Sequence, residues 1–305
     1  MYTITHKKIK GRSLIALSNA AKTSKAELCL DQGGRLSSFT FEGIQVIADP
    51  EAIDYSQSYA SSILFPFANR IKDGTFSLDN TTYTLDCNDT GLNNALHGLV
   101  YDKSFTCIHQ EATVEQALVT LVYEDKGLAQ GFPFAFKLQF IYILDKNGIQ
   151  LAVSATNTDK KSFPFSMGWH PYFVSKNLYE SYLIFNSSSQ YTYDHQKIIN
   201  GSYYANLPMP FQVEDHQLDQ GFTLEESEVQ FLTPEYNLTL SATKDNQFLQ
   251  VYTPPQGNTI AIEPMTGAPN NFNTKTGLQM LVPKATYTTE WCIAIKSLLR
   301  EKKDG

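Results

Sequence analysis

The feature that most constrains this chain is an alternation of polar and apolar residues with a period of two. Residues 75–78 (Thr-Phe-Ser-Leu) alternate, Asp79-Asn80 interrupts them, and residues 82–85 (Thr-Tyr-Thr-Leu) alternate again. Successive side chains of a strand point to opposite faces, so this pattern predicts a hairpin with one buried and one solvated face. Residues 36–47 and 238–252 predict two further hairpins on the same grounds.

Helical periodicity is nearly absent from the sequence. Residues 51–62 have room for one or two helical turns, and residues 295–303 are expected to fray outward at the C-terminal end. No segment keeps apolar residues at helical spacing over three turns. Strands do not alternate with long helices, which argues against a parallel α/β fold. We therefore expect an all-β protein built as a large antiparallel β-sandwich.

The chain length leaves room for one large domain or two modest ones. It has 305 residues, of which 42% are apolar and 18% charged, so it can bury a large core. The best linker candidates, residues 187–189 and 208–210, are neither long nor low in complexity. We expect a single domain over residues 1–305.

The charge balance excludes several classes of partner. Lys plus Arg is 24 and Asp plus Glu is 31, giving a formal net charge of −7. That balance argues against nucleic acid, whose phosphates demand a clustered basic face, and against a polybasic membrane surface. Without a membrane-length apolar stretch or a secretory signal, it is expected to be cytoplasmic. We expect a monomer or homodimer that acts on a small molecule.

Four segments place polar residues among apolar and aromatic ones, at residues 65–71, 94–98, 167–173 and 260–267. A buried charge is costly unless it is paired or used. Glu263 has apolar neighbours on both sides, so burial would raise its pKa and make it a better general base. The alternative is a structural carboxylate that caps a turn or pairs with Arg70.

His170 lies between Trp169 and Pro171. An aromatic ring beside a histidine suits a sugar, whose C–H face packs on the ring, and histidine can donate a proton near neutral pH. The alternative is an ordinary core histidine. His97, which precedes Gly98, has the same two interpretations, a sugar-site histidine or a core histidine, and the sequence supports the first less strongly than it does for His170. Arg70 is one of four arginines, and its planar fork can hold several oxygens, although it could also form an ordinary salt bridge.

Other chemistries lack a sequence signal. There is no closely spaced pair of metal ligands, no G-x-S-x-G elbow and no glycine-rich phosphate loop. The four cysteines are scattered, without a C-x-x-C pair. We therefore expect no metal and no cofactor.

Several motifs in order resemble one known family. Asn69-Arg70-Ile71-x-x-Gly74-x-Phe76-x-Leu78 looks like the N-terminal signature of the aldose 1-epimerase (galactose mutarotase-like) family. Later segments are similar to its later motifs in the same order: Asn94–Gly98, Gly168–Phe173, Ile262–Thr266 and Leu278–Pro283 with Trp291. The resemblance runs from about residue 25 to residue 297.

This resemblance implies an antiparallel β-sandwich with a sugar cleft, and interconversion of α and β anomers without metal or cofactor. It makes Glu263 the base that takes the proton of the anomeric hydroxyl and His170 the acid that protonates the ring oxygen. An ionised Glu and a protonated His on arrival of the sugar predict a bell-shaped pH profile. The implied substrate-binding residues are Arg70, His97, Asn69 and, on a short match, Asp219.

Departures from the family pattern leave the identity of the preferred sugar undetermined. Phe65-Pro66-Phe67-Ala68 stands where galactose-type members tend to have Gly-Arg-Tyr-Ala, and Leu99 stands where a second glycine is common. A hexose-6-phosphate 1-epimerase would need extra cations near the cleft. A non-catalytic carbohydrate-binding protein would use the same cleft, but binding alone requires neither a proton donor nor a proton acceptor.

Overall fold

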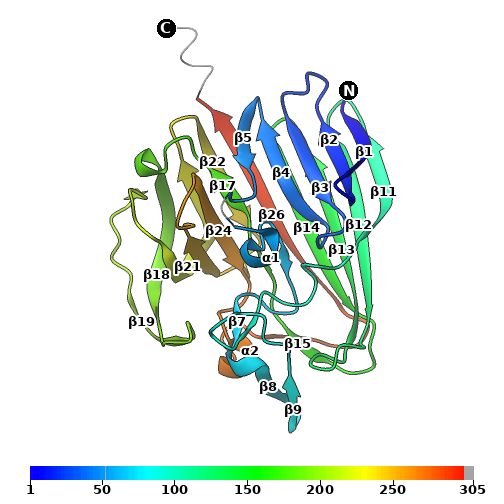
Figure 1. Cartoon of the computed structure of the whole chain (residues 1–305), viewed down its shortest axis with the longest axis vertical. Coiled ribbons are helices and arrows are strands. Elements are labelled where there is room, and N and C mark those ends of the chain that lie inside the picture. Colours follow the sequence, from blue (N-terminus) through cyan, green and yellow to red (C-terminus); the bar gives the residue numbers. More distant parts are fainter. Residues whose placement is uncertain (52, 299–305) are drawn as a thin grey trace.

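Antiparallel strands make up most of the molecule (Figure 1). The computed structural model describes residues 1–51 and 53–298. Its short helices are α1 (Tyr55–Ser58), α2 (Asn271–Thr274) and the 3₁₀ turns η1 (Lys72–Gly74) and η2 (Leu178–Glu180). The strands are β1 (Thr3–Ile9), β2 (Arg12–Ser18), β3 (Lys25–Cys29), β4 (Arg35–Phe41), β5 (Ile44–Ile47), β6 (Ile63–Leu64), β7 (Arg70–Ile71), β8 (Thr75–Leu78), β9 (Thr81–Thr84), β10 (Ala95–Leu96), β11 (Thr106–Ala112), β12 (Ala117–Lys126), β13 (Ala135–Leu144), β14 (Gly148–Asn157), β15 (Phe163–Phe165), β16 (Gly168–Trp169), β17 (Tyr172–Val174), β18 (Tyr182–Tyr193), β19 (Ile199–Tyr204), β20 (Phe211–Gln212), β21 (Asp219–Leu232), β22 (Tyr236–Ala242), β23 (Phe248–Tyr252), β24 (Thr259–Met265), β25 (Gln279–Leu281) and β26 (Thr286–Ser297).

The strands form two layers that face each other. One layer runs β11–β12–β13–β14–β26–β22–β21. The other runs β1–β2–β3–β4–β5–β17–β24–β23–β21. All these pairings are antiparallel, which confirms the expected all-β sandwich.

Two long strands belong to both layers. The second half of β21, Glu228–Leu232, pairs with β22, while its first half, Asp219–Thr223, pairs with β23. The neighbouring strand β18 follows β21 across this boundary, with two register shifts. At the opposite edge β1 and β11 lie side by side (Figure 1), and the Tyr2 N–H donates to the Thr113 carbonyl at 2.7 Å. The sheet is therefore nearly closed around its core.

The core between the layers explains the period-two pattern. Along β13 intermediate and buried residues alternate over all ten positions. The buried members, such as Phe140, pack in one cluster with Leu17 and Phe39 of the other layer. Burial of this apolar face supplies the main free energy of folding.

Two of the three predicted hairpins are confirmed, β8–β9 and β4–β5. The prediction for residues 238–252 is wrong, although β22 and β23 are both strands. β22 pairs with β21 and β26, while β23 pairs with β21 and β24. The connection between them therefore crosses from one layer to the other, and its polar turn residues look the same in sequence as a hairpin turn.

The remaining local expectations have mixed outcomes. The predicted helical turn in residues 51–62 is confirmed as α1. Residues 187–189 are not a linker, because they lie inside β18 at its register shifts. Ile295–Ser297 complete β26 instead of fraying, and residues 299–303 lie outside the described part of the chain. Among the described residues no helix is long and apolar enough to cross a membrane.

Candidate active site

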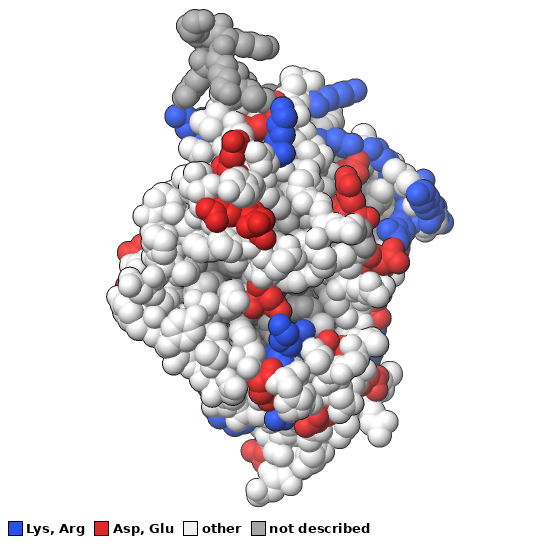
Figure 2. Space-filling view, turned by 60° about the vertical axis from the view of Figure 1, so that its left-hand side comes forward, with Lys and Arg blue, Asp and Glu red and all other residues white. Residues whose placement is uncertain are grey.

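A cleft of about 570 Å³ opens on the side of β24 that faces away from the core. All six residues singled out from the sequence line it: Asn69, Arg70, His97, His170, Asp219 and Glu263. Figure 2 shows both signs of charge gathered at a recessed part of this face, while most of the surrounding surface carries no charge. Segments that are far apart in sequence therefore meet at one place.

The alternation of strand faces places Glu263 in this cleft. Every residue of β24 is buried, because one face of the strand covers the core and the other forms the floor of the cleft. Ile260 and Ile262 belong to the core cluster, so Glu263 points the opposite way. Its cross-strand partner on β23 is Gln250, which also lines the cleft.

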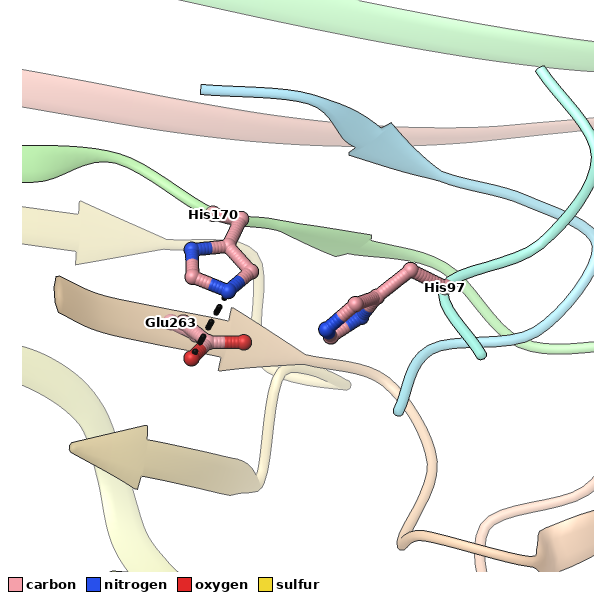
Figure 3. A group of neighbouring side chains, drawn as sticks. All are labelled: His97, His170 and Glu263. Atoms are coloured by element: carbon pink, nitrogen blue, oxygen red, sulfur yellow. Dashed lines mark ion pairs between the residues drawn. The ribbon is translucent and has the colours of Figure 1, made fainter. Parts of the chain in front are cut away.

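His170 lies at the break between β16 and β17, beside Glu263. Its Nε2 is 3.3 Å from Oε1 of Glu263, and the two side chains are 6% and 2% exposed (Figure 3). The Tyr172 ring stacks on the imidazole at 5.1 Å between ring centroids. Trp169, which the sequence suggested as a sugar platform, is instead buried in the core against Trp291. Adjacent residues of an extended chain face opposite sides, so Tyr172, and not Trp169, lines the cleft beside His170.

A two-stranded ladder brings His97 next to Arg70. β7 and β10 pair so that Leu96 is opposite Arg70, and the His97 N–H donates to the Asn69 carbonyl at 3.0 Å. His97 has a φ of 60°, and Gly98 follows with a φ of 77°. A Cβ on Gly98 would lie 2.2 Å from the Phe65 carbonyl oxygen, so only glycine fits there. This turn points the His97 ring at His170, with ring centroids 5.0 Å apart.

Arg70 is held by a residue that the sequence analysis did not single out. Its Nε donates to Oδ2 of Asp89 at 2.7 Å, and the same oxygen accepts from Asn94 Nδ2 at 3.3 Å. Arg70 therefore forms a salt bridge, as one interpretation of the sequence predicted, but its partner is Asp89 and not Glu263. Since only Nε of the guanidinium is bonded within the described residues, its terminal nitrogens can face a ligand in the cleft.

Asp219 lies at the start of β21 within a second polar network. Its two oxygens accept from Gln250 Nε2 at 2.8 Å and from Lys197 Nζ at 3.1 Å. Tyr193 donates to Gln250 Oε1 at 3.3 Å. A Cβ on Gly221 would lie 2.3 Å from the Tyr193 hydroxyl, so glycine makes room for this contact. Asp89, Gln250 and Lys197 gave no sequence signal, because their roles depend on partners far along the chain.

Burial shifts the pKa values of the three innermost groups toward their neutral forms. It raises the pKa of Glu263 well above its ordinary value, and the charge of Asp219 adds to this while that of Arg70 opposes it. Burial lowers the pKa of His170 to about 3. It also lowers the pKa of His97 well below 6.5, with smaller contributions from His170 and Arg70. The predicted rise in the pKa of Glu263 is confirmed in direction, whereas the lowered pKa of His170 runs against the expectation of a protonated imidazole.

These features define a class of protein: a β-sandwich whose open, polar cleft holds a buried carboxyl–imidazole pair. The chain also matches a family model, described as aldose 1-epimerase, over residues 13–294. It therefore belongs to the aldose 1-epimerase family.

The chain is also similar to a protein by sequence and to solved structures by fold. The uncharacterized protein YihR of Escherichia coli (strain K12) is 23% identical over 261 residues, covering 82% of this chain and 83% of YihR. A galactose mutarotase-like protein from Clostridium acetobutylicum superposes with a TM-score of 0.88 at 19% identity, over 97% of this chain and 99% of that one. Galactose 1-epimerase from Lactobacillus acidophilus NCFM gives a TM-score of 0.77 at 18% identity, over 97% and 99% of the two chains.

Proposed function

We propose that this protein is an aldose 1-epimerase that interconverts the α and β anomers of a free, uncharged hexose. The observation that carries the proposal is the contact of His170 with Glu263, at 3.3 Å from Nε2 to Oε1, inside a sugar-sized cleft. Opening a cyclic hemiacetal requires one group to accept a proton and another to donate one. The proposal assigns Glu263 as the base and His170 as the acid.

The spacing of the two groups suits the atoms on which they would act. The anomeric hydroxyl and the ring oxygen are bonded to the same carbon, so the base and the acid act on two oxygens that are close together. Contact of the carboxyl group with the imidazole therefore supports hemiacetal opening better than a reaction at two distant atoms.

The proton count of the pair also supports this chemistry. With one proton between them, Glu263 and His170 are either both neutral or an ion pair, and these two forms differ only in the position of that proton. Burial favours the neutral form of the pair. Ring opening begins from the ion pair and ends in the neutral form, and closure on the other face of the aldehyde reverses the transfer. No proton has to be exchanged with solvent during the cycle.

The surrounding groups would hold the sugar during this transfer. Arg70, fixed through Nε by Asp89, would direct its terminal nitrogens at hydroxyl or ring oxygens. His97 would contribute a ring nitrogen next to His170, and Asn69 fixes the turn that carries it. Asp219 and Gln250, already bonded to each other, would accept and donate to further hydroxyls.

The experiment is polarimetry or NMR exchange on freshly dissolved α-D-glucose and α-D-galactose. The wild-type protein should accelerate the approach to anomeric equilibrium above the buffer rate. Glu263→Gln and His170→Gln should each lower the rate by about 10²- to 10⁴-fold, the usual contribution of one acid or base. His195→Gln, on the exposed side of the β18–β19 turn, is the matched control and should keep full activity.

Two results would contradict the proposal. A rate at the buffer value for glucose, galactose and the hexose 6-phosphates would remove the enzymatic function. Saturable sugar binding without anomer exchange would instead favour a carbohydrate-binding protein that uses the same cleft.

A further inference from the structure

The innermost part of the cleft groups three side chains that can each bind a metal ion, and the proposed reaction does not require such a grouping. His97, His170 and Glu263 each offer one ligand atom, and these three atoms lie within 4.8 Å of one another. Figure 3 shows the second oxygen of Glu263 on the side of His97, while the first contacts His170. The residues come from three separate segments, so no short sequence spacing revealed the cluster.

We propose that His97, His170 and Glu263 form a binding site for one divalent transition-metal ion, with Zn²⁺ as its representative, and that the ion excludes the sugar. Two imidazoles and a carboxylate are a common ligand set for such ions. Metal binding stands on the geometry alone, whereas competition with a sugar rests on the function proposed above.

Distances in the cluster are close to those that a metal requires. Zinc–nitrogen and zinc–oxygen bonds of about 2.0–2.1 Å at tetrahedral angles separate neighbouring ligand atoms by about 3.3 Å. The His170 Nε2 to Glu263 Oε1 distance is 3.3 Å. His97 completes a set of three within 4.8 Å and needs only a small movement. The fourth position of the ion would face the open cleft.

The hydrogen bonding of the cluster is incomplete, which leaves its members available. His97, His170 and Glu263 are buried, yet His97 Nδ1, His170 Nδ1 and Glu263 Oε2 have no partner among the described residues. An unpaired buried carboxylate oxygen is costly, and a cation bound to Glu263 would offset part of that cost.

The same observation limits the affinity. A resident metal site usually has each ligating histidine held through its other ring nitrogen by a carboxylate or carbonyl group. Neither Nδ1 atom has such a partner within the described residues. We therefore infer a reversible, inhibitory site of moderate affinity and not a permanently occupied one.

The test uses the full-length protein, purified without a polyhistidine tag and dialysed against chelator. CoCl₂ is titrated in while the visible ligand-field absorption of protein-bound cobalt is followed, and ZnCl₂ is then used to displace it. One ion should bind per chain. His97→Gln and Glu263→Gln should each weaken binding by at least about 10- to 100-fold, the loss reported even for second-sphere partners. Circular dichroism of both variants establishes that they fold.

The matched control is His6→Gln, which alters a separate surface hollow that also contains Cys107 and His109. This variant should bind cobalt as the wild type does. Absence of any ligand-field signal at millimolar cobalt would overturn the proposal. So would a signal that is lost in His6→Gln and kept in both cleft variants.

A final titration separates the metal proposal from the sugar proposal. Saturating hexose should raise the apparent dissociation constant for cobalt, and ZnCl₂ should inhibit anomer exchange competitively. If cobalt binds through His97 and Glu263 but hexose has no effect on it, the metal site stands and the exclusion of sugar is refuted. If anomer exchange proceeds while cobalt fails to bind, only the metal proposal fails.

Discussion

At the scale of single residues, burial controls the chemistry of Glu263 and His170. The low-polarity surroundings disfavour any net charge on the pair, so they oppose both the addition of a second proton and the loss of the only one. The two protons of such a coupled pair are lost in two macroscopic steps that belong to the pair as a whole. Burial moves these two steps apart.

The pH profile of kcat/KM should therefore be broad. The acid limb should lie far below pH 6.5, because the pKa of His170 is lowered to about 3. The alkaline limb should lie well above 4.5, because the pKa of Glu263 is raised. A profile of mutarotation rate from pH 4 to pH 10 should show no acid limb near pH 6.5 and should locate the alkaline limb. A narrow bell with limbs near 4.5 and 6.5 would show that the groups titrate as if in water.

Glu263→Gln should change stability in a pH-dependent way. A carboxyl group whose pKa is raised on folding stabilises the protein below its unfolded pKa, and this contribution is lost as pH rises toward the folded value. The loss is about 1.4 kcal/mol per pH unit in that window. The variant should therefore gain in Tm relative to the wild type as the pH rises above about 4.5. The exposed Glu225→Gln should show no such trend in the same thermal scans.

Sequence reasoning found the residues with unusual local surroundings and missed those defined by distant partners. Glu263 and His170 stood out because apolar neighbours surround them in sequence. Asp89 lies in an ordinary polar turn, and only its contact with Arg70 gives it a role. Trp169 was misassigned because adjacency in sequence does not imply the same face of a strand.

At the scale of elements, the β7–β10 ladder and the loop that follows β9 act as one support for Arg70 and His97. The ladder fixes their backbones, and Asp89 fixes the guanidinium. Asn94 connects the loop to the β18–β19 turn by donating to the Gln196 carbonyl at 2.9 Å. The position of the Arg70 fork therefore depends on several short segments.

Asp89→Ala should impair catalysis more than it impairs folding. It removes a charge-assisted hydrogen bond and leaves the half-buried Arg70 unpaired, effects worth about 1–3 kcal/mol. We expect kcat/KM to fall by about 10- to 100-fold, mostly through KM. Asp102→Ala, which removes an exposed ion pair with Lys103, is the control. Equal losses of activity in the two variants would show that Asp89 has no special role.

At the scale of the whole molecule, the cleft balances its charges. Arg70 is paired with Asp89, and Lys197 is paired with Asp219. The chain itself carries a formal charge of −7. Within the cleft lining of the described residues, no cation is left over to neutralise a phosphate group, which supports a neutral hexose over a hexose 6-phosphate.

The proposed preference for a neutral hexose can be tested through its dependence on salt. The kcat/KM for a neutral hexose should change little between low salt and 0.5 M salt, since an uncharged ligand gains nothing from long-range attraction that salt would screen. Hexose 6-phosphates should be poorer substrates, and salt should improve them by screening repulsion. Steady-state polarimetry on both sugars at two ionic strengths measures this. Faster turnover of the phosphate at low salt would reverse the assignment.

The overall architecture was accessible from sequence, whereas the order of strands was not. Period-two patterning predicts strands and a sandwich because each strand must bury one face. It does not say which strands pair, and the crossing from β22 to β23 was therefore read as a hairpin. Sheet pairing is set by contacts between residues far apart in the chain, which local pattern does not encode.

The strands β18 and β21 run through both layers, and this continuity has a mechanical consequence. The layers cannot slide or hinge against each other there without breaking main-chain hydrogen bonds along two long strands. Asp219 begins one of these strands, so its side of the cleft is tied to the hydrogen bonding of both layers. We therefore expect the proposed sugar to enter by rotation of side chains and small displacements of surface loops, without movement of one layer against the other.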